Sequence, residues 1–208
     1  MLTTRYRIDR AIAEITDEYL QPHAHPWIVA YSGGKDSTLV LHLVVEAILR
    51  LAPSDRRRDV HVVCNDTLVE SPVLIAHARA SLEKVGRAAE SLRLPLQVHV
   101  TAPSPDQTFW CNLIGRGYPP PNRRFRWCTD RMKIGPTTRF VREHVSAAGQ
   151  VVLLVGVRRS ESANPSWRDL PASSSMWTRV ICTRRGPFGP ANSTTPSLAS
   201  GCSYWEIW

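Results

Sequence analysis

The sequence predicts an α/β protein with a doubly wound, mostly parallel sheet. Four apolar runs are too short for helices, and longer segments with helical periodicity separate them. The first run leads directly into a glycine-containing loop, as expected between a strand and a helix of an α/β fold. Ligands of such sheets bind beyond the carboxyl ends of the strands, so we expect the functional site at that edge.

The first helix and the first strand are the clearest elements. Apolar residues recur every three or four positions from Ile8 to Tyr19, which predicts an amphipathic helix over residues 4–20. The apolar run at residues 27–31 lies between Pro26 and two glycines. Because it is short and continuous, it predicts a strand buried on both faces.

The same two patterns recur along the chain. They predict further helices over 36–51, 71–92 and 130–147, and further strands over 60–64, 96–100 and 151–157. We expect three parts: an N-terminal helix at 1–26, the α/β domain at 27–164 and an irregular tail at 165–208.

The tail differs in composition from the rest of the chain. It is rich in Ser, Thr, Pro and Gly and lacks sustained periodicity, as a linker does. Its tryptophans, Trp177, Trp205 and Trp208, are unusual in a disordered linker. A truncated or frameshifted coding sequence is the other interpretation of this segment.

Charge and cysteine content favour some classes of protein over others. Lys and Arg number 26 against 18 Asp and Glu, a net charge of +8 that suits a polyanionic partner such as DNA or a nucleotide, although solubility alone is an alternative. The five scattered cysteines suit a reducing compartment. No apolar run is long enough to span a membrane and no secretory signal is present, so we expect a cytoplasmic protein with no membrane partner.

A candidate phosphate-binding loop follows the first predicted strand. Two glycines allow a sharp turn, successive backbone N–H groups can surround an anion, and the next helix contributes its positive end. A lysine supplies a point charge and an aspartate can hold Mg²⁺. The alternative is a glycine turn that merely begins a helix. The residues are Ser32, Gly33, Gly34, Lys35, Asp36 and Ser37.

Two acidic residues follow the second predicted strand. Asp66 and Glu70 should lie at the same edge of the sheet as the loop. The alternative is that Asp66 and Ser71 cap the next helix, with Pro72 at its first position.

A basic stretch rich in aromatic residues lies between the third and fourth predicted strands. Its cations and rings favour binding of phosphates or bases, and the alternative is a basic loop that shields a sheet edge. Cys128 stands among arginines just before a helix, which favours a thiolate, although a buried, inert cysteine is also possible. The candidate phosphate- and DNA-binding residues are Arg123, Arg124, Arg126 and Lys133.

The loop SGGKDS resembles the PP-loop of the ATP pyrophosphatase and phosphoadenylyl-sulfate reductase superfamily. The resemblance implies a Rossmann-like fold of the adenine nucleotide alpha hydrolase type. It also implies binding of ATP with Mg²⁺, and adenylation of a substrate with release of pyrophosphate. Lys35 and Asp36 would then be catalytic.

Further motifs narrow the resemblance to one branch. NDTLVESP, FWCNLIGRGYPPPNRRFRWC, RWCTDRMKI and GVRRSES are similar to the DndC family of DNA phosphorothioation sulfurtransferases, over about residues 5–164. That family implies DNA as a partner, a cysteine desulfurase as sulfur source, other phosphorothioation proteins and a [4Fe–4S] cluster. The resemblance implies a nucleotide site formed by the loop with Asp66, Gly156, Arg158 and Glu161.

The sequence also departs from that family. Cys128 would be catalytic and a cluster ligand, but a cluster normally takes four cysteines and only this one occupies a family-like position. The resemblance stops at Asn164, where family members continue. Two alternatives remain: a phosphoadenylyl-sulfate reductase, or a catalytically inactive nucleotide-binding module.

Overall fold

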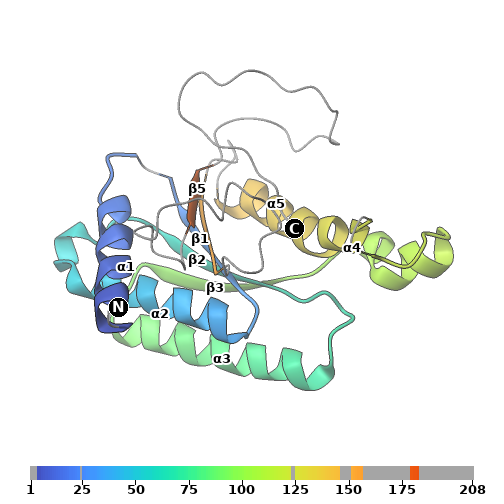
Figure 1. Ribbon diagram of the computed structural model, residues 1–208, viewed down its shortest axis with the longest axis horizontal. Coiled ribbons are helices and arrows are strands. Elements are labelled where there is room, and N and C mark those ends of the chain that lie inside the picture. The colour runs from blue at the N-terminus through green and yellow to red at the C-terminus, as the bar shows by residue number, and fades with distance from the viewer. Residues whose placement is uncertain (1–3, 24, 123–124, 146–150, 157–178, 183–208) are drawn as a thin grey trace.

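A computed structural model describes residues 4–23, 25–122, 125–145, 151–156 and 179–182. Its centre is a five-stranded sheet in the order β3-β2-β1-β4-β5 (Figure 1). The strands are β1 (Trp27–Tyr31), β2 (Val60–Asn65), β3 (Leu96–Thr101), β4 (Val152–Val155) and β5 (Arg179–Cys182). The first four are parallel, and β5 is antiparallel to β4, so the predicted doubly wound, mostly parallel sheet is confirmed.

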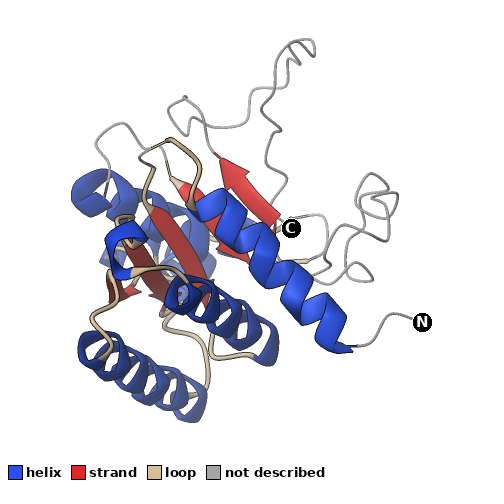
Figure 2. Cartoon of the chain, turned by 90° about the vertical axis from the view of Figure 1, so that its left-hand side faces the viewer, coloured by secondary structure: helices blue, strands red, loops and turns tan. Residues whose placement is uncertain are grey.

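Helices cover both faces of the sheet (Figure 2). The N-terminal helix α1 (Thr4–Tyr19) packs on α2 (Lys35–Arg50), and α3 (Pro72–Ser91) lies beside α2 over the same face. The opposite face is covered by helical segments between β3 and β4, which include α4 (Trp127–Thr129) and α5 (Gly135–Phe140). From β1 the chain adds β2 and β3 on one side of the sheet and then β4 on the other side. The strand order thus reverses between β1 and β4, and folds of this kind bind ligands at that point.

Both faces of the central strands are buried, which explains their continuous apolar runs. Trp27 and Val29 belong to the core beneath α1, α2 and α3, whereas Ile28 belongs to the core with Phe140. These first three of the five residues of β1 are fully buried. Alternate side chains of one strand thus fill two separate cores, as expected for a parallel strand inside an α/β fold.

The predicted elements differ from the observed ones mainly at their ends. The helix predicted over 130–147 begins earlier, at Trp127, and continues through Val145 as α-helical turns interrupted by π-helical turns at Asp130–Ile134 and Val141–Val145. A further π-helical turn, Cys111–Gly115, was not predicted. Each π-helical turn takes more residues than an α-helical turn, which regular helical periodicity does not predict.

The segment predicted as an irregular tail contributes one strand that the sequence analysis missed. The backbone of β5 pairs with β4 in the register Val152↔Cys182 to Val155↔Arg179. Its residues, Arg-Val-Ile-Cys, do not alternate between polar and apolar, so periodicity does not predict a strand here. The boundaries at residues 26 and 164 stay predictions. Among the described helices, none is both long and apolar enough to cross a membrane.

Candidate functional site

The candidate phosphate loop joins the end of β1 to the start of α2. Gly33 has a positive φ of 72°, which allows the chain to turn sharply after Ser32. The Ser37 hydroxyl donates to the Gly34 carbonyl at 3.0 Å and accepts from the Ser32 backbone N–H at 3.2 Å. These bonds close the loop on itself and fix the direction of its backbone.

Two close contacts hold this loop from opposite sides. A Cβ on Gly33 would lie 3.2 Å from the Cβ of Ala78, on α3. A Cβ on Gly156, which follows β4, would lie 2.8 Å from the carbonyl oxygen of Asp36. The glycines therefore let α3 and the end of β4 approach the loop more closely than any other residue would allow.

The beginning of α2 is suited to an anion. Gly34 precedes the helix, and no side chain caps it within the described structure. Lys35 is exposed and lies 3.0 Å from Asp36, measured between Nζ and Oδ2. An uncapped helix N-terminus with an adjacent lysine is a typical binding site for phosphate.

Asp66 lies at the end of β2 and is nearly buried. Its Oδ1 accepts a hydrogen bond from the Leu68 backbone N–H at 3.0 Å, and its Oδ2 accepts one from the Arg79 guanidinium at 2.8 Å. The first bond stabilises a turn in which Leu68 has a positive φ of 60°. The sequence analysis missed Arg79, because nothing in the sequence around this residue indicates that it pairs with Asp66.

Asn65 is a second missed residue at the same edge. Its side-chain oxygen accepts hydrogen bonds from the Thr101 hydroxyl at 2.6 Å and the Thr137 hydroxyl at 3.1 Å. Thr101 ends β3 and Thr137 belongs to α5. One amide thus connects two strand ends with the helix on the opposite face.

Charged groups surround Cys64, the residue of β2 before Asn65. Burial raises the pKa of the Cys64 thiol, and the carboxylates of Glu70 and Asp66 raise it further. The cations Arg79 and Lys133 act in the opposite direction. Glu70 and Lys133 therefore lie within electrostatic range of the same strand end as Asp66, while Cys64 itself stays a protonated thiol at neutral pH.

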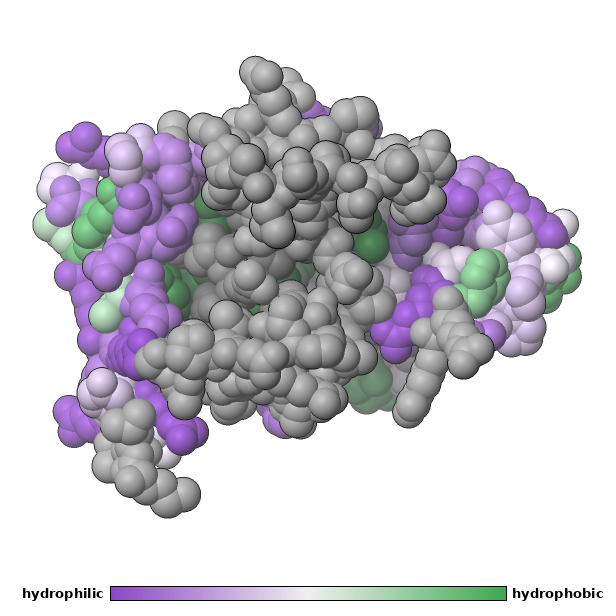
Figure 3. All heavy atoms as spheres, turned by 45° about the horizontal axis from the view of Figure 1, so that its top comes forward, coloured by the Kyte–Doolittle hydropathy of each residue, from purple (hydrophilic) through white to green (hydrophobic). Residues whose placement is uncertain are grey.

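The aromatic residues of the basic stretch are used largely for packing. Trp127 is buried, its indole N–H donates to the Pro119 carbonyl at 2.9 Å, and its ring stacks on Phe109. Trp110 and Ile114 instead are exposed (55% and 75%) at the end of the molecule formed by the Cys111–Gly115 turn. Figure 3 shows apolar patches among hydrophilic surface at this end.

The predicted site residues fall into three groups. The loop, Asp66 and Gly156 lie at the carboxyl edge of the sheet. Lys133 is close enough to that edge to act electrostatically on Cys64. Arg126 is exposed just before α4, and Cys128 is a half-buried free thiol within α4. Arg123, Arg124, Arg158 and Glu161 lie outside the described residues.

Metal-ligating side chains do not cluster in the part of the chain that is described. No three His, Cys, Asp or Glu side chains there could hold one ion together. The cysteines whose side chains are described, Cys64, Cys111 and Cys128, therefore do not by themselves form a [4Fe–4S] site, which takes four ligands. This arrangement does fit Mg²⁺ carried by a nucleotide, which needs only one or two carboxylates besides the phosphates.

Comparison with known proteins identifies the family. The model of the phosphoadenosine phosphosulfate reductase domain matches residues 26–181, so the chain belongs to that family. An uncharacterized protein of Methanocaldococcus jannaschii is 29% identical over 139 residues, 67% of this chain and 24% of the relative. The chain therefore spans about a quarter of that relative's length.

Among solved structures, an NH3-dependent NAD synthetase from Campylobacter jejuni, in complex with a nitrate ion, is similar. The match covers 77% of this chain and 59% of the synthetase, with a TM-score of 0.49 and 14% sequence identity.

Proposed function

We propose that this protein binds ATP with Mg²⁺ at the Ser32–Ser37 loop and transfers the adenylyl group to an oxygen of its substrate. The loop geometry carries this proposal, because a tight, glycine-containing turn presents the uncapped start of α2 and Lys35 at the ligand-binding edge of the sheet. Membership of the phosphosulfate reductase domain family agrees with a nucleotide-binding site of this kind.

The reaction transfers one phosphorus group and needs no covalent enzyme intermediate. The substrate oxygen attacks the α-phosphorus, a new P–O bond forms, and the bond from the α-phosphorus to the bridging oxygen breaks as pyrophosphate leaves. The protein's contribution is positioning and neutralisation of charge. Loop N–H groups and Lys35 would bind the departing pyrophosphate, and Asp36 would hold the Mg²⁺ that accompanies it.

The proposed acceptor is a phosphate oxygen of DNA, which adenylation would turn into a leaving group for incoming sulfur. The net charge of +8 and the exposed side chains of Arg126 and Lys133 support a polyanionic substrate. The cysteine desulfurase and the other phosphorothioation proteins come from the sequence resemblance alone.

Pyrophosphate release tests the adenylation step. We expect Lys35→Ala to lower the rate of ATP-dependent pyrophosphate release at least about 100-fold, the scale for loss of a group that stabilises transition-state charge. Arg87→Ala removes an exposed cation of α3 and serves as the matched control. Unchanged turnover in Lys35→Ala would contradict the assignment, and ATP binding without any pyrophosphate release would indicate an inactive module.

Salt dependence tests the DNA acceptor. We expect the protein to retain duplex DNA at low salt, with an affinity that falls steeply as salt rises. Arg126→Ala and Lys133→Ala should each reduce the slope of log K against log salt by about 0.9, the value for one lost phosphate contact. No retention at low salt, or slopes equal to that of Arg87→Ala, would exclude this surface as the DNA site.

A second candidate is reduction of a nucleotide-bound sulfate, which the matching family model favours. The half-buried thiol of Cys128 would attack the sulfate sulfur, forming a cysteine S-sulfonate and releasing the nucleotide. An external dithiol would then displace sulfite and become oxidised to a disulfide. Release of sulfite from phosphoadenylyl sulfate, lost in Cys128→Ser, would establish this reaction in place of adenylation.

A further inference from the structure

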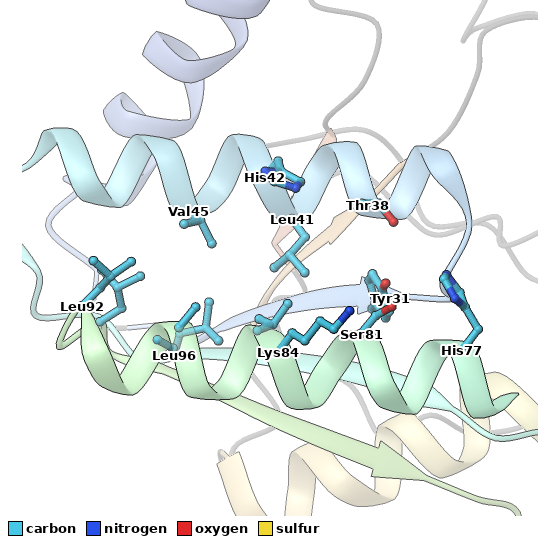
Figure 4. A pocket seen from close by; sticks show the side chains of 14 residues that line it. Tyr31, Thr38, Leu41, His42, Val45, His77, Ser81, Lys84, Leu92 and Leu96 are labelled. Atoms are coloured by element: carbon cyan, nitrogen blue, oxygen red, sulfur yellow. The ribbon is translucent and has the colours of Figure 1, made fainter.

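A groove separates α2 from α3 over one face of the sheet (Figure 4). Its volume is about 310 Å³, within the range of small-molecule sites. Residues spaced three or four apart line it from each helix, so each helix presents one face to the groove. The floor includes Tyr31 of β1 and Leu96 of β3.

The lining changes in character along the groove. One end is apolar, with Val45 of α2, Leu92 just after α3 and Leu96 around it. Towards the other end Figure 4 shows Tyr31 and Ser81, with the amine of Lys84 extending toward them. An elongated site with one apolar and one polar end matches an amphipathic molecule.

Three polar groups at that end make no hydrogen bond or ion pair with the described residues. They are the hydroxyls of Tyr31 and Ser81 and the ammonium of Lys84. The body of Tyr31 is packed against the core, since the residue is 5% exposed. Because the described residues do not use these three groups, they are available to the headgroup of a ligand in the groove.

The charge of the lining selects the headgroup. Lys84, His42 and His77 are part of it, and no Asp or Glu is. We infer that the groove binds a small amphipathic anion, with a hydrocarbon chain along the leucines and valines and a carboxylate or similar headgroup at Tyr31, Ser81 and Lys84. The polar end of the groove borders the phosphate loop, because Tyr31 and Thr38 of its lining flank that loop in the sequence. The inference does not depend on the proposed adenylation.

Decanoate is the probe for this inference, and isothermal titration calorimetry of the whole chain is the measurement. We expect saturable binding of decanoate below its micelle concentration. Decanol, decyltrimethylammonium and acetate should all bind more weakly, because each lacks the negative headgroup or the chain. ATP should not compete. Equal affinity for the cationic amphiphile, or displacement by ATP, would overturn the inference.

Variants locate the binding in the groove. Ser81→Phe fills the polar end and should abolish binding, whereas Ala80→Phe adds the same ring to an exposed neighbouring position outside the groove and should not. Lys84→Met keeps the apolar stem and should weaken decanoate about five- to tenfold without affecting decanol. Circular dichroism checks the folding of each variant. Unchanged decanoate affinity in folded Ser81→Phe or in Lys84→Met would overturn the site.

Discussion

Single atoms decide how close the phosphate loop lies to its neighbours. Gly156 follows β4, yet its missing Cβ is what allows the start of α2 to approach the end of that strand. Backbone rather than a flexible side chain would meet the added methyl group, since the nearest atoms are the carbonyl oxygen and carbon of Asp36. The loop can therefore keep its position only if residue 156 is glycine.

We expect Gly156→Ala to reduce the free energy of unfolding by about 1–3 kcal/mol, the cost of overpacking, and to weaken ATP binding as α2 shifts. Urea unfolding and a nucleotide titration measure the two effects. Gly115→Ala is the control, because a Cβ there meets nothing within 4 Å. Equal behaviour of the two variants would show that the contact does not position the loop.

At the scale of elements, one arginine fastens α1 to the sheet. The guanidinium of Arg58, which precedes β2, donates to the carbonyls of Tyr19, Gln21 and His25 and lies 2.7 Å from Nδ1 of His23. The Tyr19 hydroxyl in turn donates to the Arg58 carbonyl at 2.9 Å. The connection from α1 to β1 is therefore held by hydrogen bonds rather than by apolar packing alone.

We expect Arg58→Ala to lower the free energy of unfolding by about 2–4 kcal/mol, since several carbonyls lose a charged donor together. Its neighbour Arg57 is exposed and donates to one carbonyl, that of Ser54. Arg57→Ala should stay within about 0.5 kcal/mol of the parent protein. Similar urea midpoints for the two variants would show that the Arg58 bonds add nothing.

At the scale of the whole molecule, a histidine cluster joins strands β2 and β3 to the helical layer that contains α5. His61 of β2 and His99 of β3 lie 3.1 Å apart between ring nitrogens, and Phe140 of α5 packs against both rings. Burial lowers the pKa of both histidines, and His61 and His144 further lower that of His99, whereas Asp59 opposes the shift at His61.

These lowered pKa values predict that the protein loses stability in acid. A histidine whose pKa is lower in the folded state favours folding while it is neutral, so stability is full above the ordinary pKa of about 6.5 and declines as pH falls below it. Urea unfolding at several pH values measures this decline. His99→Gln should reduce the slope and the exposed His42→Gln should not. A stability that stays constant on acidification would contradict the prediction.

Local patterns in the sequence were sufficient for most of the fold. Helical periodicity and short apolar runs predicted α1, α2, α3 and the four parallel strands within a few residues, because two-sided burial leaves a continuous apolar run. The SGGKDS motif between a strand and a helix predicted the loop, since its glycines and the helix start are adjacent in sequence. The fold class and the position of the candidate site were thus determined by the sequence itself.

The tertiary structure decided the contacts between distant segments. The pairing of Arg79 with Asp66, the approach of Gly156 to Asp36 and the edge strand β5 all join residues that carry no local pattern of their own. The groove between α2 and α3 likewise depends on how far apart two helices settle on the sheet. Side-chain periodicity reports which face of an element is buried, whereas only packing fixes what that face meets.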